Sequence, residues 1–117
     1  MAYNVIPTPK FEDDVKFYLK KRKFVHINDD LDKVIQQLEK GNLLGDWIAD
    51  IDANNKTYKV RAANSDTKVG KSNGYRLIYY AISQDLEIYL LTVYYKKDDK
   101  KIPTDKEIKN IILQYCF

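Results

Sequence analysis

The spacing of apolar residues predicts three helices in this chain. Over residues 8–23 apolar side chains recur every three or four positions, and a threonine-proline pair begins the segment as a typical helix start. The same spacing predicts a second helix over residues 28–41, where a glycine ends the pattern. Near the C-terminus, Thr104 and Glu107 have the spacing of a capping box, so we expect a third helix to begin there.

The remaining apolar segments favour strands. A short β-prone stretch covers residues 3–6, and Lys56–Ala63 alternates between apolar and basic residues. Residues 75–83 and 86–95 are rich in β-branched and aromatic residues and lie about two residues apart, which predicts a hairpin. Residues 64–74 are expected to form a long flexible connection. The predicted order is β-α-α-β-β-β-α, an α+β fold with two N-terminal helices packed on an antiparallel sheet and a C-terminal helix.

Length and composition predict one soluble domain spanning residues 1–117. Hydrophobic residues make up 44% of the chain and charged residues 32%, which is typical of a globular protein. No apolar run reaches the roughly 20 residues that a membrane span needs, and the N-terminus does not resemble a secretory signal. The single cysteine, Cys116, has no partner within the chain, so we expect a cytoplasmic location.

Charge is unevenly distributed along the chain. Residues 1–55 carry a net charge of −2, whereas residues 56–101 carry +5, with ten Lys or Arg against five Asp or Glu. Such asymmetry favours an anionic partner, most simply a nucleic acid. The alternative is a basic surface that is merely solvated.

Few residues are suited to metal or thiol chemistry. The single histidine, His26, lies between the first two helices, and a zinc site needs several Cys or His ligands. Cys116 has no evident basic partner, and Gly70-Lys71-Ser72 lacks the first glycine of a phosphate-binding loop. We therefore expect no metal and no cofactor. The acidic residues of the first two helices are expected to be solvated.

Basic and aromatic residues of the predicted sheet can meet on one face. Lys59 and Arg61 project from the same side of their strand, Arg76 begins the next strand, and Tyr94 and Lys96 share a face at the end of the last. Such a set suits a phosphodiester, because arginine binds phosphate in bidentate fashion and lysine neutralises charge. The alternative is that strand-edge lysines only deter aggregation. The candidate site residues are Lys59, Arg61, Lys71, Arg76, Tyr94 and Lys96.

Three short motifs follow one another through this region. Residues 58–61 carry a K-x-R strand, residues 70–80 a G-K-S-x-G-x-R entry to the next strand, and residues 90–97 an L-L-T-V-Y-Y-K strand end. Together with a turn at residues 44–46, the ordered set resembles the HigB branch of the RelE/ParE toxin superfamily. Asn73 stands where that family usually has glycine.

The resemblance implies a toxin of a type II toxin–antitoxin pair that cleaves mRNA on the ribosome without a metal. The RNA's own 2′-OH would attack the adjacent phosphorus. The implied roles are proton transfer by Lys59 or Lys71, phosphate binding by Arg61 and Arg76, backbone contact by Lys96 and base stacking by Tyr94. We expect Arg76→Ala to abolish toxicity without disturbing the fold.

The resemblance also implies a partner, a HigA-like helix-turn-helix antitoxin, through which the toxin would reach operator DNA only indirectly. The first helix has more apolar and aromatic residues than one narrow stripe can bury, which favours docking of the antitoxin on the helices; they are Phe11, Phe17, Tyr18, Leu19 and Phe24. The alternative is that Phe17 and Phe24 fold into the core at the helix ends. Three other functions stay open: gyrase inhibition of the ParE type, a non-catalytic nucleic-acid-binding module, and a basic face that only docks an acidic partner.

Overall fold

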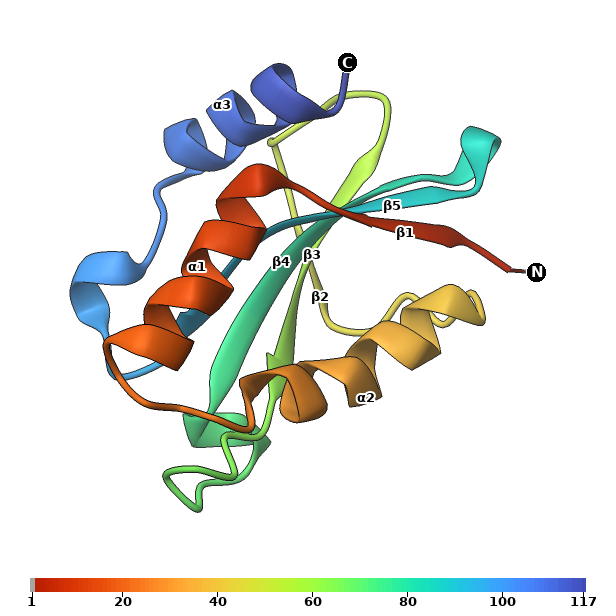
Figure 1. The fold of residues 1–117 in the computed structure, drawn as a ribbon. Coiled ribbons are helices and arrows are strands. Elements are labelled where there is room, and N and C mark those ends of the chain that lie inside the picture. Colours follow the sequence, from red (N-terminus) through yellow and green to blue (C-terminus); the bar gives the residue numbers. More distant parts are fainter. Residues whose placement is uncertain (1) are drawn as a thin grey trace.

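Residues 2–117 form an α+β fold with three α-helices and a five-stranded sheet (Figure 1). The structure is a computed structural model that describes residues 2–117. Three short 3-10 turns lie between the larger elements, and one of them, η1 (Lys71–Asn73), matters below. The elements are β1 (Asn4–Pro7), α1 (Pro9–Lys20), α2 (Ile27–Glu39), β2 (Asp46–Ile48), β3 (Lys56–Ala62), β4 (Tyr75–Ile82), β5 (Glu87–Tyr95) and α3 (Asp105–Tyr115).

The sheet is mixed rather than wholly antiparallel. Its strand order is β1-β5-β4-β3-β2, and β1 pairs with β5 in parallel while all other neighbours are antiparallel. The prediction of an antiparallel sheet was therefore wrong for β1, because four residues of β-prone sequence carry no information about their partner. The sequence prediction also missed β2, which has only three residues. The predicted hairpin of β4 and β5 is confirmed.

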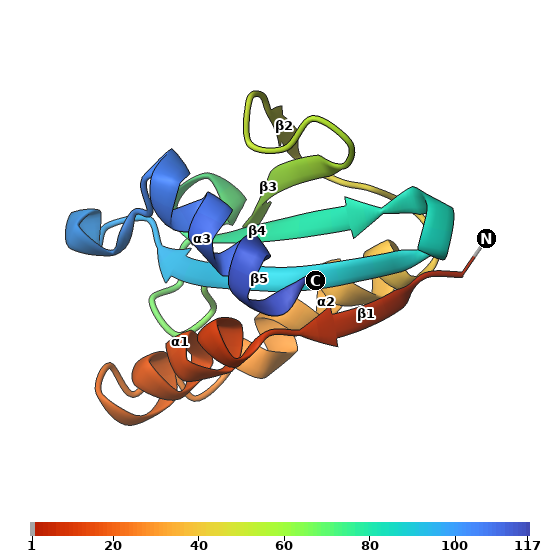
Figure 2. The same ribbon diagram turned by 90° about the horizontal axis from the view of Figure 1, so that it is seen from above.

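Helices cover both faces of the sheet (Figure 2). One face packs against α1 and α2, as predicted, through the alternate β4 residues Tyr75, Leu77 and Tyr79. The other face packs against α3 and includes Ile78 and Tyr80. Alternation along a strand thus sorts β4 into two apolar clusters, and both sides of this central strand are buried.

Helix α1 also covers the part of the β5 edge that lies beyond β1. The Asp14 carboxylate accepts hydrogen bonds from the Thr92 hydroxyl and from the Val93 N–H, and the Tyr18 hydroxyl accepts one from the Tyr95 N–H at 2.8 Å. An uncovered strand edge is a template for aggregation. Asp14 is 6% exposed, so the expectation that acidic residues of α1 are solvated was wrong for this one.

The connection from β3 to β4 is tied to α2 rather than free. Asn64 and Val69 form an isolated bridge, and the Asp30 carboxylate accepts hydrogen bonds from the Ser65 N–H at 2.9 Å and from its hydroxyl at 3.0 Å. Asp30 is likewise buried, contrary to the expectation that acidic residues of α2 are solvated. Its carboxylate positions the loop that leads to η1.

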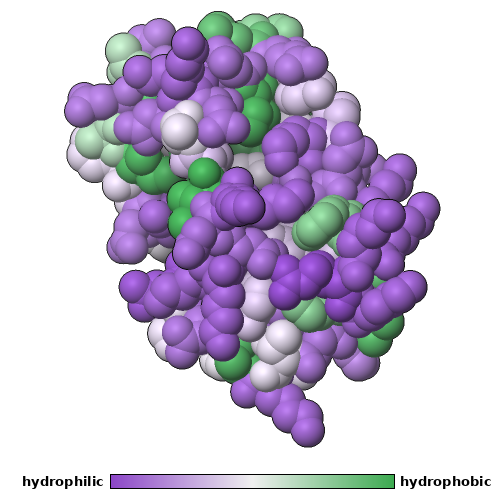
Figure 3. Space-filling model, turned by 90° about the vertical axis from the view of Figure 1, so that its left-hand side faces the viewer, coloured by the Kyte–Doolittle hydropathy of each residue, from purple (hydrophilic) through white to green (hydrophobic). Residues whose placement is uncertain are grey.

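The helices leave little aromatic surface for a docking partner. Phe24 is 7% exposed and stacks on Tyr18, and the half-buried Phe17 lies under the Lys101 ammonium, 3.7 Å from the ring centre. The side of the molecule that lies to the left in Figure 1 is largely hydrophilic, with apolar residues in separate patches (Figure 3). The prediction of antitoxin docking on the helices assumed aromatic surface that the fold cannot bury. This assumption was wrong for Phe24, which belongs to the core. Among the described residues no helix combines the length and apolar character of a membrane span.

Candidate functional site

Five of the six predicted site residues line one cavity. It has a volume of about 390 Å³ and lies where β3, β4 and β5 approach the segment before α3. Its lining consists of Asp46, Lys59, Arg61, Arg76, Tyr94, Lys96 and Ile102. Four cations and one carboxylate thus line the cavity, and the excess of positive charge is that of an anion-binding site.

Strand register brings these side chains together. Arg61 of β3 lies opposite Arg76 of β4, which in turn lies opposite Tyr94 of β5. Directly opposed residues project from the same face of a sheet, so the three side chains form a row across it. Lys96 follows β5 and is held at the end of this row because its N–H donates to the Gly74 carbonyl at 2.9 Å.

Arg76 is buried and braces the turn before its own strand. Its Nη1 donates to the carbonyls of Lys71 at 3.1 Å and Tyr75 at 3.2 Å, and its Nη2 donates to that of Ser72 at 2.8 Å. The side chain is only 7% exposed, so the expectation that it projects freely into the open face was wrong. Burial, and then repulsion from Arg61, lowers the pKa of Arg76. An arginine pKa starts high enough for the group to stay cationic.

Tyr94 is not free to stack on a nucleobase. It is 4% exposed, and its ring belongs to the apolar cluster beneath α3. Burial raises the pKa of Tyr94, and the positive charge of Arg76 opposes part of that rise. The phenol therefore stays protonated at neutral pH, which suits a proton donor better than the stacking role that the sequence suggested.

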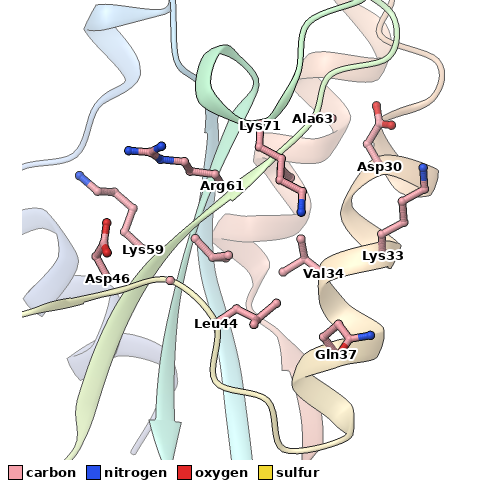
Figure 4. Close-up of a pocket in the computed structure, with 13 residues that line it drawn as sticks. Asp30, Lys33, Val34, Gln37, Leu44, Asp46, Lys59, Arg61, Ala63 and Lys71 are labelled. Atoms are coloured by element: carbon pink, nitrogen blue, oxygen red, sulfur yellow. The ribbon is translucent and has the colours of Figure 1, made fainter.

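Lys59 and Arg61 are the more accessible cations of the cavity. Arg61 is exposed and Lys59 half-buried, and both side chains point away from α2 (Figure 4). This confirms the prediction that they project from one face of β3. Asp46 of β2 lies opposite Lys59 in the register, so a carboxylate borders the basic set.

Lys71 is the one predicted residue that does not line this cavity. Its side chain points toward α2, on the other side of β3 from Lys59 and Arg61 (Figure 4). It lines a second cavity, of about 630 Å³, between α2 and β3, and Lys59 and Arg61 border that cavity as well. Only the main-chain carbonyl of Lys71 serves the first cavity, through its hydrogen bond with Arg76. Lys59 is therefore the better placed of the two lysines proposed for proton transfer.

Asp46 and Ile102 are cavity residues that sequence reasoning did not select. Asp46 reaches the cavity through β2, whose three residues are too few to show an alternating pattern. The only signal was the turn at residues 44–46, where Gly45 has φ 101° and its backbone lies close to Lys59. Ile102 is 47% exposed and comes from an irregular segment that carries no signal.

The histidine and the cysteine lie outside this cavity. His26 pairs with Asp66, with 2.8 Å between Nδ1 and Oδ1, and this contact raises the pKa of His26. Burial raises the pKa of the Cys116 thiol to about 12, so the thiol is not ionised at neutral pH. Within residues 2–117 no group of three or more His, Cys, Asp or Glu side chains is arranged to hold a metal ion.

The chain matches no model of a known protein family, and none of the curated proteins matches its sequence.

Proposed function

We propose that this protein is a HigB-like toxin of a type II toxin–antitoxin system, an endoribonuclease that cleaves mRNA on the translating ribosome without a metal. The observation that supports this proposal is the cavity that Tyr94 lines together with four cations, Lys59, Arg61, Arg76 and Lys96. A phosphodiester that enters it meets several cations and a protonated phenol. The motifs that resemble the HigB branch supply the same residues.

Cleavage of RNA by its own 2′-OH needs a proton acceptor, charge stabilisation and a proton donor. We assign the acceptor role to Lys59, which in its neutral form would take the proton from the 2′-OH as that oxygen attacks phosphorus. Tyr94 would donate its proton to the departing 5′-oxygen. The products are a 2′,3′-cyclic phosphate and a 5′-hydroxyl.

The arginines of the cavity have different tasks in this proposal. Arg61 is accessible and would bind the non-bridging phosphate oxygens directly. Arg76 already donates to three main-chain carbonyls, so it contributes its positive charge and holds η1 in place. Lys96 is exposed at the rim and would contact the backbone of the RNA strand.

A toxin of this kind requires neutralisation in its host. We propose a HigA-like helix-turn-helix antitoxin as the partner, with operator DNA reached only through that partner. Because Phe24 is buried, masking of the basic cavity is now the simpler mode of inhibition. Protection from hydrogen exchange on residues 56–97 in the complex would support masking, and protection confined to residues 10–40 would contradict it.

Expression in bacteria tests the proposed activity. We expect induction of the chain to arrest growth while new mRNA 5′ ends appear within translated regions. Arg61→Ala should remove both effects, whereas Lys40→Gln, at the exposed end of α2, should retain them. Growth arrest with intact mRNA and trapped DNA gyrase would favour the ParE-type function. RNA binding without cleavage or growth arrest would favour a non-catalytic module.

A further inference from the structure

The cavity between α2 and β3 adjoins the proposed cleavage site, because Asp46, Lys59 and Arg61 line both cavities. Its other lining residues take no part in the proposed cleavage step. It holds about 630 Å³, within the range of small-ligand sites. Val34 and Leu44 give it apolar walls, and Gln37 adds an amide (Figure 4). These three residues come from α2 and from the segment before β2. The cavity therefore has a surface on which a flat apolar ring can lie.

The backbone of β3 forms another wall of this cavity. A Cβ on Gly45 would lie 2.5 Å from the Lys59 carbonyl oxygen, so that carbonyl faces the β2 side of the strand. A Cβ on Gly74 would lie 2.1 Å from the Ala62 carbonyl oxygen, which therefore faces the β4 side. Because carbonyl directions alternate along a strand, the N–H and C=O of Arg61 face the β2 side. Strand β2 begins at Asp46, opposite Lys59, and has no residue opposite Arg61, so this donor and acceptor adjoin the cavity.

Two lysines approach the mouth of the cavity from opposite sides. Lys33 extends from α2 and Lys71 from η1 (Figure 4). Neither takes part in an ion pair among residues 2–117. The nearby Asp30 carboxylate accepts two hydrogen bonds from Ser65 and holds the loop. Lys33 and Lys71 are thus free to bind an anionic group.

We infer that this cavity binds a single nucleotide. The base would lie against Val34 and Leu44 with its hydrogen-bonding edge toward the Arg61 main chain, and the phosphate would meet Lys33 and Lys71. An added peptide strand is a poorer fit, because the open stretch of β3 is short and Asn64 already pairs with Val69. The inference rests on the proposed function in taking the occupant to be a nucleotide of the RNA strand, next to the one that is cleaved.

Titration of the purified protein with mononucleotides tests this site. We expect AMP, GMP, CMP or UMP to shift the amide NMR signals of residues 33–37, 61–63 and 71. Inorganic phosphate and adenosine should each bind at least about tenfold more weakly than the best nucleotide, because each lacks half of the contacts. The double variant K33Q/K71Q should lose about tenfold or more in affinity. The control K20Q/K40Q removes the same charge outside the cavity and should bind as the parent does.

Three outcomes would overturn the inference. They are equal binding of phosphate and nucleotide, signal shifts confined to residues 94–96, and an unchanged affinity of K33Q/K71Q. The nucleotide site and the proposed nuclease activity can be tested separately. Nucleotide binding here by a chain that leaves mRNA intact would support this site and contradict the nuclease. Cleavage of mRNA without these shifts would support the nuclease and overturn this site.

Discussion

At the scale of single residues, burial divides the cations of the cavity into two kinds. Arg61 and Arg76 are directly opposed in the sheet, yet one is exposed and the other is 7% exposed with three carbonyl partners. The sequence alone predicts that both share a face. The sequence cannot reveal that the Arg76 guanidinium binds main-chain carbonyls of residues 71–75, because those hydrogen bonds depend on the path of this segment in space.

This difference predicts different effects of the same substitution. Arg76→Ala should lower the free energy of unfolding by about 1–3 kcal/mol, since three carbonyls lose their donor. Arg61→Ala should change it by no more than about 0.5 kcal/mol while reducing mRNA cleavage about a hundredfold or more. Urea denaturation and a cleavage assay on each variant measure both effects. Equal stabilities of the two variants would contradict the structural role of Arg76.

The phenol of Tyr94 supports a second prediction at this scale. Tyr94→Phe keeps the ring in the cluster beneath α3 and removes only the hydroxyl, so stability should change little. If Tyr94 is the proton donor, cleavage should fall by about 10²–10⁴-fold. With the pKa of Tyr94 raised, the parent should lose donor activity only above pH 10, as the phenol ionises. Full cleavage by Tyr94→Phe at neutral pH would remove Tyr94 from this role.

His26 offers a pH-dependent test of the contact that holds the β3–β4 connection. The Asp66 carboxylate raises the pKa of His26 above its ordinary 6.5, so the pair contributes stability below that pH. This contribution should disappear as pH rises through the folded-state pKa. An NMR titration should show the pKa of His26 falling in Asp66→Asn and staying high in the control Asp105→Asn. Identical titration curves in all three proteins would contradict the contact.

At the scale of elements, the sequence predicts the long helices and strands, which have a recognisable residue pattern, and misses features of the short strands. The first two helices and β3 follow from regular spacing, and β4 and β5 follow from their content of β-branched and aromatic residues. The third helix follows from the Thr104–Glu107 capping box, which is confirmed. Neither the three residues of β2 nor the parallel pairing of β1 leaves such a pattern. Five predicted site residues meet because alternation along β3 and the order of β3, β4 and β5 fix their faces. Lys71 was misplaced because it lies in a turn, where alternation does not apply.

The approach of β2 to β3 depends on Gly45. This residue has φ 101°, and an added Cβ would lie 2.5 Å from the Lys59 carbonyl oxygen. Gly45→Ala should therefore cost about 1–3 kcal/mol of unfolding free energy and weaken the β2–β3 pairing. Gly70→Ala is the matched control, since a Cβ there meets no atom within 4 Å. Denaturation curves measure the difference, and equal midpoints would contradict the close approach.

At the scale of the whole molecule, the helices and the candidate site occupy different parts of the sheet. Helices α1 and α2 bury one face and α3 covers part of the other (Figure 2). That second face also carries the row of Arg61, Arg76 and Tyr94, which runs from the exposed Arg61 to Tyr94 in the cluster beneath α3. Four of the ten Lys and Arg residues in the range 56–101 line the cavity of the candidate site. This group of four cations is the physical basis of the nuclease proposal.

The chemistry of the cleaved ends tests the proposed activity most directly. The purified protein would be added to ribosomes programmed with an end-labelled mRNA, beside the same mRNA without ribosomes. We predict cleavage only on ribosomes, with a 2′,3′-cyclic phosphate on one fragment and a 5′-hydroxyl on the other, and none with Arg61→Ala. Intact mRNA, or fragments that carry a 5′-phosphate, would contradict the proposal that this cavity promotes attack by the RNA's own 2′-OH.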